Sequence, residues 1–475
     1  MGNPKAFLTI RRKEAGYRPI HDRIYDFTEV EQTLNIEDRK LQASRCMDCG
    51  VPFCHWACPL GNRQPEWQDL ASRGKWKEAY ENLSQTNDFP EFTGRICPAL
   101  CEKACVLALS GEAVTIREDE AAIVERAFEE GHIVARPPLR RSGKRVAIIG
   151  SGPAGLACAN RLNKAGHSVT VFEKDEAIGG LLRFGIPDFK LNKQVVDRRL
   201  RLMRDEGVEF RPSTFVGRDI SGRELMERFD AVCLAIGAGV PRDLSIEGRD
   251  LQGIYFALQL LQQQNRINAG EQVAPEERIS AKGKRVLVIG GGDTGSDCVG
   301  TVIRQGAVEV TQIEIMPKPP VDYNPDTPWP AYPRILKTTS SHQEGCRRRW
   351  SLSSRRFIGK DGHVTGVEVE RVEWIKDEAS GRLVPKSTGE IETIEADMVL
   401  LAMGFVHPVL EGVVEELAPS LDGRKNVGVD DSQATSVAGL FAAGDVSTGA
   451  SLVVRAIASG RRAAENIDRY LLRIG

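Results

Sequence analysis

Seven of the chain's eleven cysteines are concentrated between positions 46 and 105. They are Cys46, Cys49, Cys54, Cys58, Cys97, Cys101 and Cys105. The first four follow the spacing Cys-x2-Cys-x4-Cys-x3-Cys-Pro, in which three close thiolates hold one cubane cluster and the cysteine before the proline serves another. Three further thiolates follow between positions 97 and 105. The pattern predicts two 4Fe-4S clusters, and therefore electron transfer.

Two cubane clusters need eight ligands, but this window holds seven cysteines. Either another residue binds one iron, or one cluster lacks an iron. His55 is close in sequence, but its side chain would compete with the turn that joins Cys54 to Cys58. Better candidates are the carboxylates of Glu118, Asp119 and Glu120.

Other uses of these cysteines fit the sequence less well. Disulfide frameworks usually belong to short secreted chains, and seven is an odd number. Zinc sites usually close with two Cys-x2-Cys pairs or with histidines. The remaining cysteines are isolated, with no Cys-x-x-Cys among them, so we expect inert core positions rather than a redox pair. They are Cys158, Cys233, Cys298 and Cys346.

A glycine-rich turn at 150–155 reads Gly-Ser-Gly-Pro-Ala-Gly, between an apolar strand expected at 145–149 and a helix. Glycines let the backbone approach a pyrophosphate at the helix N-terminus. A carboxylate at the end of the next strand, 168–172, can accept hydrogen bonds from an adenosine ribose. The predicted dinucleotide contacts are Gly150, Gly152, Pro153, Ala154, Gly155, Glu173 and Lys174.

A second unit of the same type starts near position 284, with Gly-Gly-Gly-Asp-Thr-Gly at 290–295 and a carboxylate 19 residues beyond the last glycine. Its predicted contacts are Gly290, Gly292, Asp293, Thr294, Gly295 and Glu314. Two such sites in one chain predict one flavin and one nicotinamide, because a hydride donor is useful only beside an acceptor.

Two further segments are typical of flavin binding. The loop 179–191 contains paired glycines and a Gly-Ile-Pro turn that could lay its backbone along an isoalloxazine ring. Near the C-terminus, an apolar strand ends in an acid and is followed by a helix expected from about 452 to 472. These segments and a crossover glycine add the predicted contacts Gly180, Leu181, Gly185, Ile186, Gly404, Gly444, Asp445, Ser451 and Leu452.

Over residues 143–475 this order of motifs resembles the two-dinucleotide-binding flavoproteins, and the runs 235–237 and 402–404 match their crossover strands. The resemblance implies that Asp445 bonds the ribityl chain and that the helix after Ser451 points at the pyrimidine end of the flavin, where its N-terminus stabilises negative charge. The expected fold is α/β, with two Rossmann-like dinucleotide-binding domains preceded by a mostly helical iron-sulfur domain. The expected segments are 1–142 (iron-sulfur), 143–250 (FAD), 251–403 (NAD(P)H) and 404–475 (FAD, second part).

Together with the N-terminal module, the chain resembles the small subunits of bacterial glutamate synthase and the matching part of dihydropyrimidine dehydrogenase. The resemblance extends to three further segments, at 290–306, 314–317 and 341–345. It implies one cluster on Cys46, Cys49, Cys54 and Cys105. It implies another cluster on Cys58, Cys97, Cys101 and Glu120.

The resemblance also implies the reaction. Electrons from NAD(P)H would pass through FAD and two 4Fe-4S clusters to a separate large (alpha) subunit, which makes glutamate from glutamine and 2-oxoglutarate. Two alternatives stay open: an oxidoreductase of the same architecture serving ferredoxin or a pyrimidine-reducing subunit, and a non-catalytic docking scaffold. No acid-base catalytic residue is assigned, because catalysis here consists of positioning and redox tuning.

The sequence leaves the choice between NADH and NADPH open. The carboxylate of Glu314 would accept bonds from a free 2′-hydroxyl and repel a 2′-phosphate, which favours NADH. Three consecutive arginines at 347–349 could fold back to bind a phosphate. Nearby, His342 and Glu344 are expected to be ordinary loop residues.

Helical patterns such as 66–83 and 118–130 surround the cysteine loops, and residues 316–350 are predicted to be irregular. With 64 basic and 66 acidic residues and no basic run interleaved with aromatics, we expect no nucleic-acid partner. The longest apolar stretches, such as 399–406, fall far short of the roughly 20 residues that span a bilayer. Without a membrane segment or a cleavage-like N-terminal site, a cytoplasmic location is expected.

Overall fold

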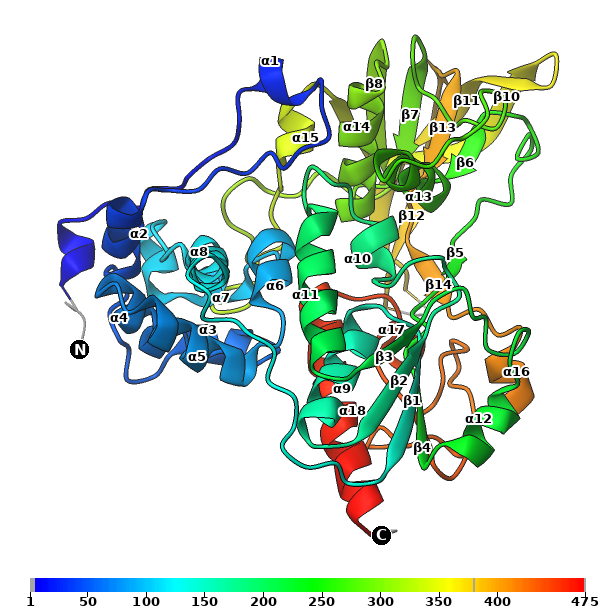
Figure 1. The fold of residues 1–475 in the computed structure, drawn as a ribbon. Helices are drawn as coiled ribbons and strands as arrows, with labels where there is room; N and C mark the ends of the chain where they lie inside the picture. Colours follow the sequence, from blue (N-terminus) through cyan, green and yellow to red (C-terminus); the bar gives the residue numbers. More distant parts are fainter. Residues whose placement is uncertain (1–4, 379–380, 474–475) are drawn as a thin grey trace.

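The computed structural model describes residues 5–378 and 381–473, and it consists of a helical module beside two α/β lobes (Figure 1). The helical module confirms the predicted helical iron-sulfur region. Its elements are η1 (Ala6–Leu8), α1 (Ile20–Arg23), α2 (Ile36–Ala43), α3 (Phe53–Ala57), α4 (Gln64–Ser72), α5 (Trp76–Thr86), α6 (Pro90–Ile96), α7 (Leu100–Ala104), η2 (Val106–Ser110) and α8 (Ile116–Glu129).

The single helix expected over 66–83 is wrong in one respect, because the chain forms α4 and α5 with a turn between them. Gly74 in that turn has φ +70, a left-handed conformation that ends a helix and suits glycine. The helix expected at 118–130 is present as α8.

The first lobe is a parallel five-stranded sheet in the order β15-β4-β1-β2-β3. Its strands are β1 (Arg145–Ile149), β2 (Ser168–Phe172), β3 (Glu209–Arg211), β4 (Ala231–Leu234) and β15 (Leu440–Ala442). Its helices are α9 (Pro153–Lys164), α10 (Leu181–Phe184), α11 (Lys193–Asp205), α12 (Gly222–Arg228), α16 (Val413–Leu417), α17 (Asp445–Thr448) and α18 (Val453–Arg473). Because β15 pairs with β4, the end of the chain completes a sheet that begins near residue 145.

The second lobe is a parallel sheet in the order β6-β13-β7-β8-β9, with a three-stranded antiparallel sheet beside it. Its elements are β6 (Ile254–Phe256), α13 (Ala257–Asn268), β7 (Arg285–Ile289), α14 (Asp293–Arg304), β8 (Glu309–Glu314), α15 (Ser340–Gln343), β9 (Arg347–Trp350), β10 (Leu352–Lys360), β11 (His363–Lys376), β12 (Leu383–Glu395) and β13 (Met398–Leu401). The short pair β5 (Val240–Pro241) and β14 (Phe405–His407) lies where the chain crosses between the lobes. The predicted fold class is therefore confirmed, whereas the exact domain boundaries stay predictions.

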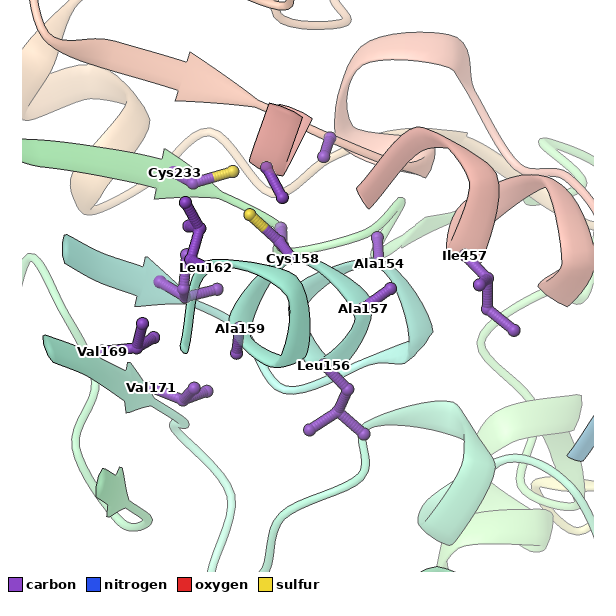
Figure 2. Packing of buried hydrophobic residues seen from close by; sticks show 14 of the residues in the cluster. Ala154, Leu156, Ala157, Cys158, Ala159, Leu162, Val169, Val171, Cys233 and Ile457 are labelled. Atoms are coloured by element: carbon purple, nitrogen blue, oxygen red, sulfur yellow. The ribbon is translucent and has the colours of Figure 1, made fainter. Parts of the chain in front are cut away.

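Strands β1, β4 and β13 are continuous apolar runs because both faces of their parallel sheets are covered. In the second lobe, α13 and α14 cover one face, and strands β10 and β11 cover the other. In the first lobe, Figure 2 shows Ala154 and Ala157 of α9 beside Ile457 of α18, in one buried cluster. The two helices approach so closely that a Cβ added at Gly460 would lie 2.1 Å from the carbonyl oxygen of Ala154. This packing carries the C-terminal segment to the first glycine turn.

The expectation that 316–350 is wholly irregular is wrong for its last part. Residues 340–343 form α15, and β9 pairs in parallel with β8. Along the described part of the chain, none of the helices combines the length and apolar character that crossing a membrane requires.

A buried ion-pair cluster joins the three parts of the molecule. Arg23, at the end of α1, donates from Nε to Oε1 of Glu344 at 2.7 Å, and Arg304 of α14 donates from Nη1 to Oε2 at 2.6 Å. The three side chains are at most 2% exposed. The guanidinium of Arg304 also lies 4.0 Å from the ring centre of Phe189 in the first lobe. Glu344, expected to be an ordinary loop residue, is thus a structural link between modules.

We expect Glu344→Gln to destabilise the full-length protein by about 3 to 5 kcal/mol, because it leaves two buried guanidinium groups without a counter-charge. The measurement is calorimetric thermal unfolding. Glu209→Gln is the matched control, since Glu209 pairs with Arg211 at side-chain exposures of 51% and 61% and such pairs contribute at most about 1 kcal/mol. Equal, small shifts in both variants would contradict the assignment.

Candidate functional site

The first glycine turn joins β1 to α9 and is fixed by sterics. Gly150 has φ +102, and a Cβ there would lie 2.4 Å from the carbonyl oxygen of Ala235; a Cβ on Gly155 would lie 2.0 Å from the oxygen of Gly150. At Gly152, by contrast, an added Cβ meets no protein atom within 4 Å. The turn therefore needs its first and third glycines for its own shape, and the second leaves open space over the helix N-terminus, where Pro153 and Ala154 begin α9.

Glu173 is 5% exposed and lies directly after β2. Its Oε2 accepts hydrogen bonds from the backbone nitrogen of Ser151 at 3.0 Å and from its Oγ at 2.5 Å. Its Oε1 accepts from the nitrogen of Asp175 at 3.0 Å. The carboxylate is thereby held beside the turn, while neighbouring Lys174 is exposed to solvent.

The second turn, between β7 and α14, repeats this geometry. A Cβ on Gly290 would lie 2.2 Å from the oxygen of Ala402, and one on Gly295 would lie 2.3 Å from the oxygen of Gly290, whereas Gly292 again has open space. Glu314 accepts from the backbone of Gly291 at 2.6 Å and of Met316 at 3.2 Å. Asp293 and Thr294 are the first two residues of α14. The two turns are structurally equivalent.

The loop predicted to lie along the flavin begins against the first turn. A Cβ on Gly180 would lie 3.0 Å from the Cα of Gly152, and the backbone of Gly179 donates to Oγ of Ser151 at 2.8 Å. Leu181 opens α10 and is 41% exposed, and Gly185 ends it. The carbonyl of Ile186 accepts from Nδ2 of Asn265 on α13 at 2.9 Å, so this loop reaches the second lobe.

The C-terminal candidates lie on the other side of the same turn. A Cβ on Gly444 would lie 2.7 Å from that of Ala154, which places Asp445 close to α9. Ser451 donates from Oγ to Asp445 at 2.8 Å, and burial raises the pKa of that carboxyl. Leu452 directly precedes α18. Gly404, with φ +82, accepts a backbone bond from Arg242 at the crossover.

The cysteines fall into two groups, and one group shares a cavity. The cavity, about 400 Å³ including its part open to solvent, lies between α3, α4, η2 and the start of α8. Its cysteines are Cys46, Cys49, Cys54 and Cys105. Burial, together with the neighbouring thiols of Cys105 and Cys49, raises the pKa of Cys46 to about 12. Thiols this close together and this poorly solvated require a metal or cluster to become thiolates.

The other group surrounds Glu120 of α8. Burial raises the pKa of Cys58, Cys97 and Cys101, and the charge of Glu120 adds to the effect on all three. Burial likewise raises the pKa of Glu120, to about 7. Its Oε1 accepts from Nδ2 of Asn87 at 2.9 Å and from Oγ1 of Thr93, and the described part of the structure records no hydrogen bond on Oε2. One carboxylate oxygen is thus held in place, and the carboxylate lies near enough to the three thiols for its charge to raise their pKa.

The two preceding carboxylates on α8, Glu118 and Asp119, are hydrogen-bonded to other groups. Glu118 accepts from Arg39 at 2.9 Å and from the backbone of Ala15 at 3.2 Å. Asp119 is bonded by Arg39 at 2.8 Å and by Gln68 at 2.9 Å. Of these three, Glu120 is the carboxylate whose charge raises the pKa of Cys58, Cys97 and Cys101. Asn87 and Thr93 carry no motif that sequence reasoning could have used.

Within the described residues, no three His, Cys, Asp or Glu side chains converge as a single metal ion would require. A cubane has four irons, so its ligands are spread more widely than those of one tetrahedral zinc ion.

The four isolated cysteines lie away from both groups. Cys158, Cys233 and Cys298 are fully buried, as expected for core residues, and Cys346 is partly buried. Figure 2 shows the sulfurs of Cys158 on α9 and Cys233 on β4 turned toward each other inside the apolar core.

The arginine triplet does not converge on Glu314. Arg347 pairs with Glu309 at 3.0 Å, and Arg349 pairs with Glu392. Arg348 lies 5.1 Å from the ring centre of Trp350, which pairs in register with Glu314. Lys318 lies 5.3 Å from the same ring. A tryptophan with two cations thus stands beside the carboxylate of the second turn.

His342 of α15 is buried, and its Nε2 lies 2.9 Å from Oε1 of Gln312 on β8. The backbone nitrogen of Thr339 donates to its Nδ1 at 3.2 Å. Burial, with Arg348 and Lys190 nearby, lowers the pKa of His342 to about 4. The imidazole is therefore a neutral structural link between α15 and β8.

Two family descriptions match this chain: pyridine nucleotide-disulphide oxidoreductase over residues 144–460, and dihydropyrimidine dehydrogenase domain II, 4Fe-4S cluster, over residues 23–132. Among solved structures, FprA of Mycobacterium tuberculosis in complex with NADPH is similar in fold, with a TM-score of 0.56 and 21% identity over 71% of this chain and 85% of that one.

Named relatives are similar over almost the full length. Glutamate synthase [NADPH] small chain of Mycobacterium tuberculosis (strain H37Rv) is 49% identical, over 99% of this chain and 96% of that protein. The protein of the same name from Bacillus subtilis is 42% identical, over 99% of each. Glutamate synthase [NADH] of Schizosaccharomyces pombe is 44% identical, over 98% of this chain but 22% of that protein.

Proposed function

The chain belongs to the family of glutamate synthase small chains, and from this premise we propose that it is the electron-input subunit of a glutamate synthase. It would oxidise a nicotinamide dinucleotide and deliver electrons to a large subunit that makes glutamate from glutamine and 2-oxoglutarate. One observation carries the proposal: two equivalent dinucleotide turns and two groups of cluster-type ligands are built into one chain.

The first turn, the loop 179–186 and the segment 444–452 are proposed to hold FAD. When bound there, FAD converts a two-electron donor into single electrons for iron-sulfur clusters. The chain's part is positional: Gly152 leaves room for the pyrophosphate, Glu173 is held to face a ribose, and the N-terminus of α18 supplies positive potential.

The two cysteine groups are proposed to hold two 4Fe-4S clusters, with Glu120 as the eighth ligand. Its fit rests on the donor set: three thiols lie near enough to the Glu120 carboxylate for its charge to raise their pKa, and its second oxygen has no recorded partner in the described structure. The three cysteines of this group supply three ligands, and the carboxylate oxygen of Glu120 would supply the fourth.

The donor is proposed to be NADPH. The carboxylate of Glu314 favours a free 2′-hydroxyl, but the relative with 49% identity is named for NADPH, and Lys318 and Arg348 stand over Trp350 beside Glu314. These two cations are the groups that would neutralise a 2′-phosphate.

We expect Arg348→Ala to raise KM for NADPH about 10- to 100-fold, since a hydrogen bond to a charged group contributes roughly 1.5 to 3 kcal/mol. The KM for NADH and kcat should change little, as steady-state dye reduction with each donor would measure. Arg347→Ala is the control, because Arg347 is 78% exposed and pairs with Glu309. An equal rise of KM for both donors would contradict the 2′-phosphate role.

The partner is proposed to be a separate large subunit. The matched Schizosaccharomyces pombe protein is far longer than this chain, which corresponds to 22% of it, so the two activities can share one polypeptide. Since the described helices include no membrane span, the proposed location is the cytoplasm.

The deciding experiment is anaerobic reconstitution with iron, sulfide and flavin quantification, followed by NADPH titration monitored by absorbance and EPR. About eight irons and one FAD per chain, with NADPH-dependent dye reduction, are expected. Glutamate formation should require added large subunit. Zinc without iron would overturn the relay, and a dye-inactive protein would support the scaffold alternative instead.

A further inference from the structure

Gln64, the first residue of α4, is a buried amide in the cavity that holds four cysteines. The side chain is 1% exposed and lines this cavity together with Cys46, Cys49, Cys54 and Cys105. Neither its Nε2 nor its Oε1 has a hydrogen-bond partner in the described structure. Burying an amide without partners costs free energy, so its position indicates a partner that the protein itself does not supply.

The rest of the lining is almost wholly apolar. It comprises Met47, Pro52, Phe53, Pro65, Val106, Leu107, Val114 and Ile116. The other polar residue in the lining is Gln68, whose Nε2 donates to Asp119 at 2.9 Å. Its unpartnered Oε1 is an acceptor and cannot donate to sulfur. In this lining, Gln64 is therefore the side chain whose amide nitrogen makes no recorded hydrogen bond.

We propose that Gln64 donates a hydrogen bond from Nε2 to a sulfur of the cluster held by Cys46, Cys49, Cys54 and Cys105, and thereby raises the reduction potential of that cluster. This inference rests on the proposed function. Reduction adds negative charge to the cluster, and an N–H donor in an apolar cavity stabilises that charge. The effect is confined to this cluster, because Gln64 does not belong to the Glu120 group.

The positions of the two cysteine groups indicate which way electrons pass between the two clusters. Leu60 and Ile96, which lie near Cys58 and Cys97 in the chain, pack against the core of the first lobe. Cys46, Cys54 and Cys105 pack against the core of the helical module, which also includes Cys101 of the Glu120 group. Through Leu60 and Ile96, the Glu120 cluster is thus on the flavin side. Raising the potential of the Gln64 cluster makes the outward electron step favourable.

The test compares wild type, Gln64→Leu and Gln64→Glu as full-length, anaerobically purified proteins. Iron and FAD are quantified first, and each cluster is then titrated with dithionite under EPR. One net hydrogen bond of about 1 kcal/mol corresponds to roughly a fivefold change in the reduction equilibrium. At 59 mV per tenfold for one electron, Gln64→Leu should shift one midpoint by about 40 mV to more negative potential. Gln64→Glu keeps the shape and replaces the donor by an anion, so its shift should be at least as large.

Gln68→Leu is the matched control, because it removes a second amide from the same lining whose nitrogen already donates to Asp119. It should leave the midpoint within about 10 mV of wild type. Full iron content with an unshifted midpoint in both Gln64 variants would overturn the inference, as would an equal shift in Gln68→Leu. If Gln64→Leu loses iron, the Gln64→Glu titration decides. Absence of iron from wild type would instead overturn the proposed clusters.

Discussion

Gly155→Ala is expected to yield a protein that retains no FAD and is less stable by about 3 kcal/mol or more. The new Cβ would lie 2.0 Å from the carbonyl oxygen of Gly150, a backbone atom that cannot move without opening the turn. Because this turn also sets the start of α9, both the site and the packing of α9 on β1 are affected. Flavin content after gel filtration and calorimetric unfolding measure the two effects.

Gly152→Ala is expected to weaken FAD binding without changing the stability of the folded protein. An added Cβ there meets no protein atom within 4 Å, and φ is −67, which alanine adopts readily. We therefore expect unfolding of the FAD-free protein to be unchanged, while FAD affinity falls at least about tenfold, because the Cβ occupies the space left for the pyrophosphate. Normal FAD affinity in Gly152→Ala would mean that the dinucleotide does not approach this turn, and the flavin site would have to be assigned elsewhere.

Glu120→Ala is expected to alter one cluster and spare the other. Iron content should fall by about one to four atoms per chain, and the low-temperature EPR spectrum of a single cluster should change, because the carboxylate is the proposed eighth ligand. Electron delivery to the large subunit should fall at least about tenfold, whereas NADPH-dependent reduction of a dye at the flavin should persist. The first readout, iron and EPR, is independent of activity.

Two variants on the same helix sharpen this result. Glu118→Ala removes a carboxylate that is bonded to Arg39 and to the backbone of Ala15, so both clusters should keep their spectra. Glu120→Gln keeps an oxygen that can bind iron, and it should retain more iron than Glu120→Ala. Unchanged iron and spectra in Glu120→Ala would reject the ligand assignment and return the question to a cluster with a missing iron.

The buried contacts around Glu344 join the N-terminal segment to the second lobe. Arg23 belongs to the N-terminal segment, whereas Arg304 and Glu344 belong to the second lobe. A further ring contact links Phe27 to Phe189 of the first lobe, at 6.5 Å between ring centres. These contacts therefore link the second lobe and the first lobe to the N-terminal segment of the module that carries the cysteines.

Several features of this protein were determined by the sequence alone, because they are local. A glycine turn after an apolar strand, with a carboxylate at the end of the next strand, depends on residues within one β-α-β unit. Both turns consequently form as predicted, with Glu173 and Glu314 held in equivalent positions. The cysteine spacing likewise indicated iron-sulfur chemistry, since three of the ligands lie within one short loop.

Cysteine spacing alone left open how the seven cysteines divide between two sites. The family resemblance implied a division, and the tertiary structure gives the physical reason for it. Cys105 joins the cavity of Cys46 although Cys101, four residues earlier, lies with the Glu120 group, because the intervening α7 ends between them. Adjacent carboxylates on α8 differ in role because helix rotation turns each toward a different neighbour. The unpartnered amide of Gln64 and the link through Glu344 depend on packing between separate elements, and no periodicity or spacing in the sequence encodes such contacts.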